Sequence, residues 1–224
     1  MLKRKSAAIM LAMLVCCAVM AIVDGLIMPH YAVKSAVKAV LFFGAPAVYA
    51  VLDKERLLIP LFKTNKNGLG YSVLFGLLVY IAIVGGYFLL KDVFDFSAIT
   101  NALTGNIGVN RNNFAFVAIY ISFANSFLEE FFFRGFGFLV LKKLTSSKTA
   151  AIFSSAVFSL YHVAMMVGWF SAGLYFLCIA GLFVGGLIFN LLNLKTKNIY
   201  TSWLVHMFAN FAINTIGFIL FGII

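Results

Sequence analysis

The chain has 224 residues, of which 63% are hydrophobic and 11% are charged. Together with a mean hydropathy of +1.05, this composition excludes a water-soluble globular domain. The net charge of +10 does not indicate a nucleic-acid-binding protein, because the lysines and arginines form short clusters between apolar runs rather than one basic face. The apolar runs are about 17 to 28 residues long, as in membrane-spanning helices. We therefore predict an all-α, polytopic transmembrane helix bundle.

About seven spans are predicted, within a range of about six to eight. In chain order they cover residues 7–23, 36–52, 71–90, 114–141, 149–167, 173–193 and 200–224. The fourth run is longer than one upright crossing needs and the second is short, so we expect tilt or a break in either. The first run follows a basic cluster and has no small-residue cleavage site beside Asp24, so we expect a retained span rather than a signal peptide.

The basic residues predict how these spans are oriented. With the N-terminus in the cytoplasm, the inner segments hold about twelve lysines and arginines and the outer segments about four. The outer four are Lys34, Lys38, Lys91 and Arg111. The positive-inside rule therefore predicts a cytoplasmic N-terminus. Short loops, the phenylalanine and lysine content and the lack of an organellar signal indicate an integral protein of a bacterial cytoplasmic membrane.

The longest outer connection, residues 91–113, is rich in Asn, Gly and Thr and is predicted to be a loop. It divides the chain into an N-terminal part, residues 1–113 with about three spans, and a second helix bundle, residues 114–224. In the second part, Gly181 and Gly185 have the spacing that lets two membrane helices pack closely. The three cysteines show no metal-like spacing and are predicted to be packing residues.

A few strongly polar side chains remain inside the predicted spans. They are Glu129, Glu130, Arg134, His162, His206 and Asn210. A charged group at the centre of a membrane helix costs about 2.5–3.5 kcal/mol, so such residues usually face a protein interior and carry function. Glu130 and Arg134 are four residues apart and can pair on one helical face, whereas Glu129 has no obvious partner in its own helix.

The depths of these side chains agree. At about 1.5 Å per residue from the inner ends of their helices, Glu129, His162 and His206 lie at levels within roughly 8 Å of one another. His206 and Asn210 are four residues apart and project to the same side. We therefore expect one buried polar cluster. Three other interpretations remain open: a structural polar network, an ion-pair staple between helices, and the proton relay of a small ion-coupled transporter.

Three motifs follow one another on the later spans: EEFFFR at residues 129–134, FSLYH at residues 158–162 and HMFAN at residues 206–210. In this order they resemble the EExxxR, FxxxH and HxxxN pattern of the CPBP family of intramembrane proteases, also called the Abi or CAAX protease-like family. The resemblance covers roughly residues 114–215 and implies that residues 114–224 are the catalytic helix bundle. The HExxH zinc motif and the GxSG motif of rhomboid-like proteases are absent from the sequence.

The resemblance also implies roles for the site residues. Glu129 would be the catalytic carboxylate, His162 would help to hold and activate water, and His206 and Asn210 would hold the oxyanion. Alternatively, Glu129, His162 and His206 would bind a metal, most simply zinc, as the only cofactor. Glu130, Arg134 and Phe158 would support the site. Either version is chemically sound, because a buried carboxylate is a good base and a three-ligand zinc site is common in hydrolases.

The predicted function is that of an intramembrane endopeptidase. Its expected partners are the lipid bilayer and a peptide or membrane-protein substrate, such as a bacteriocin or pheromone precursor, and no nucleic acid. The competing hypothesis is a non-catalytic scaffold or regulator that keeps this fold, binds a membrane-protein partner, or confers self-immunity to a bacteriocin.

Overall fold

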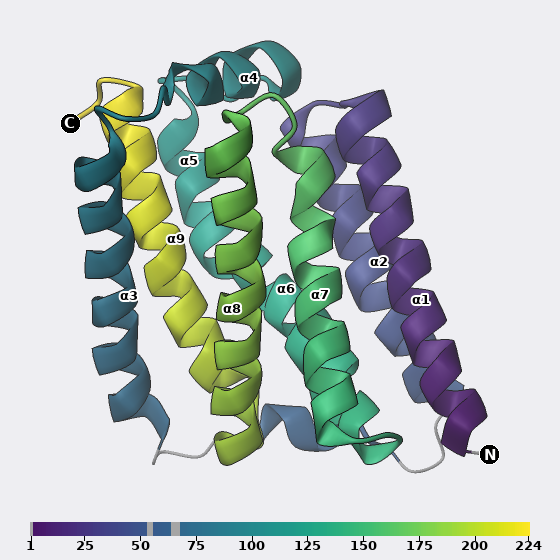
Figure 1. The fold of residues 1–224 in the computed structure, drawn as a ribbon. Coiled ribbons are helices and arrows are strands. Elements are labelled where there is room, and N and C mark those ends of the chain that lie inside the picture. Colours follow the sequence, from purple (N-terminus) through teal and green to yellow (C-terminus); the bar gives the residue numbers. More distant parts are fainter. Residues whose placement is uncertain (1, 53–55, 64–67) are drawn as a thin grey trace.

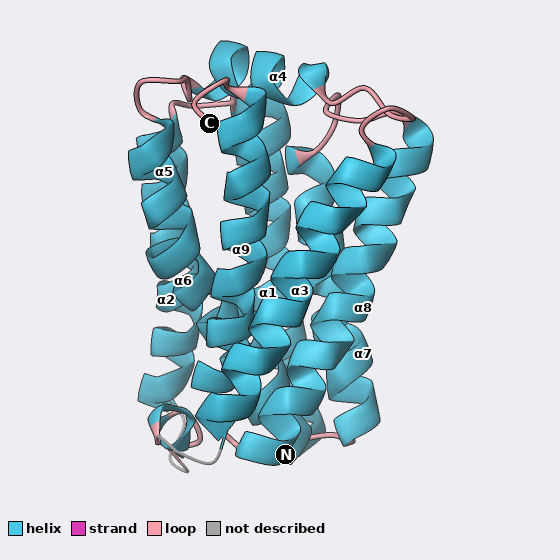
Figure 2. Cartoon of the chain, turned by 90° about the vertical axis from the view of Figure 1, so that its left-hand side faces the viewer, coloured by secondary structure: helices cyan, strands magenta, loops and turns pink. Residues whose placement is uncertain are grey.

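The computed structural model describes residues 2–52, 56–63 and 68–224, and within these residues every regular element is helical. Long helices run side by side between two ends of a bundle, as Figures 1 and 2 show from two directions. The elements are α1 (Leu2–Ile22), η1 (Val23–Ile27), α2 (Tyr31–Leu52), η2 (Ile59–Phe62), α3 (Leu69–Leu90), α4 (Ser97–Ile107), α5 (Phe114–Tyr120), η4 (Ile121–Asn125), α6 (Ser126–Glu129), η5 (Glu130–Val140), η6 (Leu141–Lys143), α7 (Ser147–Met165), α8 (Ala172–Thr196) and α9 (Tyr200–Leu220).

Six helical segments of the described chain are long and apolar enough to cross a membrane. They are Leu2–Ile27, Tyr31–Leu52, Leu69–Leu90, Phe114–Lys143, Ala172–Thr196 and Tyr200–Leu220. The α7 helix runs alongside them over a similar height (Figure 1) but is less apolar, because it contains several serines and a histidine. The prediction of a polytopic helical bundle is confirmed, and the protein is an integral membrane protein.

The start of α1, the junction of η6 with α7 and the end of α8 all lie at one end of the bundle (Figure 1). These segments carry the basic clusters at residues 3–5, 142–143 and 195–197. The gathering of basic groups at one end agrees with the distribution from which the orientation was inferred. The cytoplasmic placement of this end stays a prediction.

The α2 helix begins five residues before the predicted span. Lys34 and Lys38, which were counted with the outer basic residues, both lie within the helix and are buried, although only Lys34 precedes the predicted span. The expectation was wrong because each ammonium group has a carboxylate partner inside the bundle: Asp24 for Lys34 and Glu129 for Lys38. A paired cation can be buried where an isolated one cannot.

The fourth predicted span is a single helical run from Phe114 to Lys143. It is not broken, but η4 and most of its second half, η5, are π-helical. A π-helix bonds residue i to i+5 and so has more residues per turn than an α-helix. Consecutive side chains then diverge by a smaller angle, and neighbouring residues can face one partner. Glu129 and Glu130 lie at the junction where η5 begins.

The connection after α3 is not a simple loop. It contains α4, an eleven-residue helix that lies across one end of the bundle (Figure 1). Several of the polar residues that suggested a loop, such as Asn101 and Thr104, lie within this helix. Before it, Asp95 accepts a hydrogen bond from the Ser97 N–H, and Gly108 ends the helix with a φ of 70°. Asn113 then binds the Gly108 carbonyl.

Close packing between helices does not use the predicted glycine pair. A Cβ at Gly181 or Gly185 would meet no described atom within 4 Å, so the prediction of a packing motif there was wrong. Gly186 instead lies against Ser155, where a Cβ would be 3.1 Å from the backbone of α7. Gly76 of α3 lies directly against the Phe208 ring of α9. Cys16 and Cys17 are buried and reduced, in agreement with a packing role, and Cys178 is partly buried.

Candidate active site

Carboxylates, a lysine and a histidine from separate helices meet in the interior of the bundle. Glu129 ends α6, Glu130 begins η5, His206 lies in α9 and Lys38 lies in α2. All four are buried, with Glu129 3% exposed and Glu130 fully enclosed. With Arg134, these residues are called the central cluster below.

The two carboxylate oxygens of Glu129 have different surroundings. Oε1 accepts hydrogen bonds from the Lys38 ammonium group and from Asn125 Nδ2, the latter at 3.1 Å. Oε2 faces the ring of His206, with Nε2 at 3.7 Å. One oxygen is therefore occupied by donors, whereas the other is directed at a histidine without a direct hydrogen bond.

Glu130 is more fully engaged than its neighbour. Its Oε1 lies 2.9 Å from His206 Nδ1 and 3.3 Å from an Arg134 nitrogen, and its Oε2 accepts a hydrogen bond from the Ser202 hydroxyl. A carboxylate is an acceptor, so Nδ1 of His206 carries the proton and Nε2 is directed at Glu129. Glu130 thus orients His206, in addition to forming the predicted pair with Arg134.

The Arg134 guanidinium group is held mainly by its charge and by aromatic rings. It is fully enclosed, and within the described residues its nitrogens make no hydrogen bond. Its central carbon lies 3.8 Å from the centre of the Phe158 ring and 5.0 Å from that of Phe189. Stacking of a guanidinium on an aromatic face is favourable when both are desolvated. Phe158 of the second motif therefore contacts the cation of the first.

His162 lies in α7, beside the central cluster. Its Nδ1 donates to the Phe158 carbonyl at 2.8 Å, because a carbonyl oxygen can only accept. The other nitrogen, Nε2, is then free to accept a proton or a hydrogen bond. Glu129 and His162 are close enough to interact electrostatically, and the histidine side chain is partly exposed.

Asn210 lies one turn beyond His206 on α9 and is 6% exposed. Its Nδ2 donates to the Ile121 carbonyl of η4 at 3.0 Å. An amide nitrogen has two N–H groups, so one remains available to another acceptor. The structure therefore brings Glu129, Glu130, Arg134 and His206 into contact, and places His162 and Asn210 at the edges of that group.

Three polar contributors were missed by the sequence analysis: Lys38, Asn125 and Ser202. Each could have been found from the spacing of four residues that places side chains on one helical face. Asn125 precedes Glu129 by four, and Ser202 precedes His206 by four. Lys38 follows Lys34 by four, but both were counted with the outer basic residues, and the predicted span began at residue 36, after Lys34.

The charges of the central cluster balance. Lys38 and Arg134 supply two positive charges, and Glu129 and Glu130 supply two negative charges, while a neutral His206 adds none. A buried group of ions is tolerated when its members are paired and hydrogen-bonded. Charge balance therefore explains how the bundle encloses four ionisable groups that lipid would exclude.

The metal alternative was tested against the same geometry. In the part of the chain that the structure describes, no three His, Cys, Asp or Glu side chains are grouped closely enough to hold a metal ion. The Lys38 ammonium group occupies Oε1 of Glu129, and Nδ1 of both histidines is used as a donor. Glu129 Oε2 and Nε2 of both histidines are not used by these bonds, so within the described residues it is only the spacing of the three side chains that does not fit a zinc ion.

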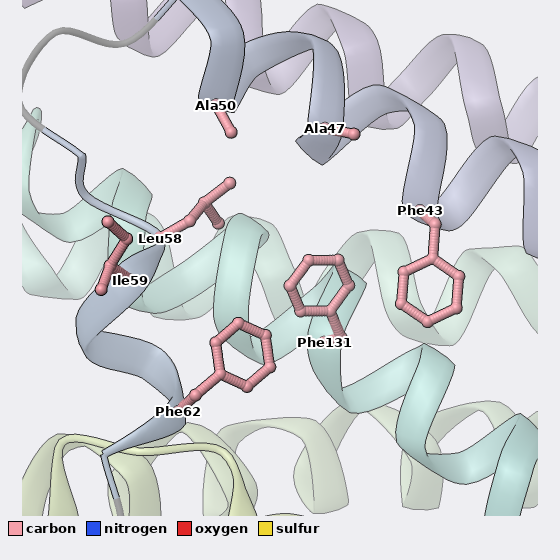
Figure 3. A pocket seen from close by; sticks show the side chains of 7 residues that line it. All are labelled: Phe43, Ala47, Ala50, Leu58, Ile59, Phe62 and Phe131. Atoms are coloured by element: carbon pink, nitrogen blue, oxygen red, sulfur yellow. The ribbon is translucent and has the colours of Figure 1, made fainter.

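An apolar pocket of about 450 Å³ opens on another face of the bundle, between α2, η2 and η5. Figure 3 shows Phe43 of α2, Phe62 of η2 and Phe131 of η5 around it. The rings of Phe62 and Phe131 are stacked with centres 5.7 Å apart. None of the residues that line this pocket belongs to the central cluster, so the pocket is a feature separate from the polar site.

One family model matches the part of the chain that contains most of this site. Residues 111–212 match the family model described as type II CAAX prenyl endopeptidase Rce1-like. This segment belongs to the CPBP family. The match confirms the resemblance that the three motifs indicated. The CPBP proteases are therefore the enzymes with which this site is compared. The CPBP segment contains all four predicted catalytic residues, whereas Lys38 lies outside it. No curated protein and no solved structure matches the chain.

Proposed function

We propose that the protein is an intramembrane endopeptidase that hydrolyses a peptide bond at the central cluster without a metal ion. The observation that carries this proposal is the pairing of Glu129 Oε2 with His206 Nε2 at 3.7 Å. Each of these groups is held through its other polar atom, Glu129 by Lys38 and Asn125 and His206 by Glu130. Two oriented groups of this kind suit proton transfer.

In the proposed reaction, Glu129 Oε2 takes a proton from water while the water oxygen forms a bond to the carbonyl carbon of the substrate. The electron pair of the C=O double bond moves to oxygen. When the tetrahedral intermediate collapses, the C–N bond breaks and Glu129 returns the proton to the leaving amine. Glu129 acts first as a base and then as an acid, and so ends each cycle unchanged.

The other residues have roles that suit their positions. His162 Nε2 is a free acceptor and would hold the second hydrogen of the water. Asn210 retains one N–H group that would donate to the oxyanion. His206 would stabilise the same charge once Nε2 is protonated, since the neutral ring carries its proton on Nδ1. Glu130, Ser202 and Arg134 would fix the ring of His206, and Phe158 would hold the Arg134 guanidinium group.

The substrate class is inferred from the setting of the site. Enclosure among helices within the membrane suits a small peptide precursor or a membrane-associated protein that reaches the site from the bilayer. The matched family description names prenyl endopeptidases. For this chain we propose an unprenylated substrate such as a bacteriocin or pheromone precursor, in a bacterial cytoplasmic membrane.

Glu129→Gln tests the proposal directly. Purified protein in lipid vesicles is assayed with a library of fluorescence-quenched apolar peptides and with a membrane-anchored reporter. We expect the rate to fall by about 10²- to 10⁴-fold, the contribution of a general base. The matched control is Asp24→Asn, which removes another carboxylate with an enclosed side chain by the same isosteric change.

Asp24→Asn is expected to keep the wild-type rate. Equal rates for wild-type protein and Glu129→Gln would reject the proposal. A wild-type protein that cleaves neither probe, but supports a cellular phenotype that survives Glu129→Gln, would indicate the competing function of a scaffold or self-immunity protein. Proton-dependent flux through the vesicles, lost in the same variant, would indicate a transporter.

The metal-free mechanism has its own test. Metal content is measured on purified protein, and the cleavage rate is measured before and after chelation. We expect less than about one zinc ion per ten chains and an unchanged rate, since the candidate ligands of the described residues are not grouped closely enough to hold a metal. Stoichiometric zinc whose removal abolishes cleavage would overturn this part of the proposal.

A further inference from the structure

Lys38 contributes to the central cluster from outside the CPBP segment. It lies in α2, 91 residues before Glu129, and is 5% exposed. Its ammonium group donates to Glu129 Oε1 and to Asn125 Oδ1, the latter at 2.6 Å. It also lies 5.0 Å from the centre of the Tyr161 ring. The cation therefore has partners on several sides within the protein, as a desolvated ammonium group requires.

Lys38, Asn125 and Glu129 form a closed triangle. Asn125 accepts from Lys38 through Oδ1 and donates to Glu129 Oε1 through Nδ2. Because the amide uses both of its ends, its orientation is fixed by the lysine on one side and the carboxylate on the other. The two bonds to the carboxylate both fall on Oε1, so the carboxylate plane is held with Oε2 directed at His206.

We propose that Lys38 and Asn125 are a positioning pair that selects Oε2 of Glu129 as the reactive oxygen. The inference rests on the proposed function, because it assigns a role in that reaction. Neither residue touches the reacting atoms; both act through Glu129. A general base gains from an oriented lone pair, and a displacement of about 1 Å can lower a rate by about a hundredfold. On this view residues 1–113 complete the active site of the CPBP segment.

An ion pair that only holds two helical segments together would explain the same burial of Lys38. The chain contains such a pair for comparison, between Lys34 and Asp24. Lys34 lies one turn before Lys38 on α2, is also buried, and binds Asp24 at 2.8 Å. Asp24 has no such second contact: within the described residues its oxygens make no hydrogen bond. Lys34 therefore has the helix, burial and charge of Lys38 without a connection to the site residues.

The experiment compares Lys38→Met with Lys34→Met in vesicles, using the peptide that wild-type protein cleaves fastest. We expect Lys38→Met to lower kcat about a hundredfold with KM changed less than about threefold, since substrate contacts remain. Lys38→Arg restores the charge and is expected to recover at least about tenfold of that loss. Lys34→Met is expected to keep kcat within about twofold, although its thermal stability falls as that of Lys38→Met does.

Asn125→Leu provides a second variant that keeps both charges of the Lys38–Glu129 pair. Its kcat is expected to fall about tenfold, because Oε1 loses one of its two donors. If Lys38→Met does not accumulate in the membrane, Asn125→Leu alone tests whether Glu129 is positioned through Oε1. A wild-type kcat in Asn125→Leu, or an equal loss of kcat in Lys34→Met and Lys38→Met, would overturn the positioning role.

The two proposals fail in different ways. If Glu129→Gln is inactive and Lys38→Met and Asn125→Leu are as active as wild type, the peptidase assignment stands and only the positioning role is rejected. If wild-type protein and Glu129→Gln do not differ, the peptidase assignment is rejected, and the positioning role is rejected with it.

Discussion

The η5 and α3 segments show opposite relations between polarity and burial. All eleven residues of η5 are buried, including Glu130 and Arg134. The α3 helix is twice as long and contains no charged residue, yet only Ser72 and Gly76 are buried. Figure 1 shows α3 at the edge of the bundle, next to α9.

Lipid as the solvent explains this difference. Apolar side chains gain little from leaving hydrocarbon, so α3 is stable at the edge, where its leucines contact lipid. Charged side chains lose a great deal in hydrocarbon, so the polar segment must be enclosed by other helices. Between these two segments burial therefore follows charge rather than hydrophobicity, which differs from the rule for water-soluble domains.

Removing the enclosed guanidinium group of Arg134 should have the largest effect on the free energy of unfolding. Arg134→Met leaves Glu130 without its guanidinium partner, and loss of one member of a buried pair costs about 3–5 kcal/mol. We expect the free energy of unfolding in mixed micelles to fall by that amount. Arg111→Met, which removes an exposed arginine, should change it by less than about 0.5 kcal/mol. Similar values for the two variants would contradict the comparison.

The reverse experiment adds a charge to α3 at the edge of the bundle. Its expected effect, on the free energy of membrane insertion, is somewhat smaller. Leu78 lies near the middle of α3 and is 55% exposed, so Leu78→Lys places an ammonium group in lipid. The expected cost of insertion is about 2.5–3.5 kcal/mol. Insertion is measured with glycosylation reporters at either end of the helix.

The matched control is Leu69→Lys at the first residue of α3, where the side chain can reach the membrane surface. We expect this variant to insert nearly as well as wild type. Equal insertion of the two lysine variants would show that α3 does not contact lipid at its centre.

The smallest effect is expected at the contact between α3 and α9. Gly76 lies against the Phe208 ring, so Gly76→Leu forces the two helices apart and should lower the free energy of unfolding by about 1–3 kcal/mol. Gly85→Leu on the same helix meets no described atom within 4 Å and should leave stability unchanged or slightly higher. An equal loss of unfolding free energy in Gly85→Leu would contradict the importance of the contact between Gly76 and Phe208.

Most of the fold could be predicted from the sequence, because spans in a bilayer must be long and apolar. The start of α2 was predicted too late, since Lys34 and Lys38 resemble residues of a loop until their carboxylate partners are known. The α4 helix was missed for a similar reason. Asn and Gly residues indicate a loop, yet Asn101 and Gly105 lie within the helix, and Gly108 ends it.

The candidate site was predicted in its members but not in its contacts. Glu129 was expected to lack a partner in its own helix, and Asn125, four residues earlier, is one. Glu130 was expected to pair with Arg134, and it also binds His206 and Ser202. The additional contacts arise where η5 begins, because a π-helix lets two adjacent carboxylates face one histidine.

The sequence by itself determined which segments enter the membrane and which polar side chains remain there, because both follow from local composition and from the spacing of residues along one helix. Only the tertiary structure decided which of two adjacent glutamates has a free oxygen. That difference depends on Ser202 and His206, which occupy both oxygens of Glu130 from positions 72 and 76 residues later in the chain. Contacts between helices far apart in sequence depend on how the helices pack, which no local pattern records.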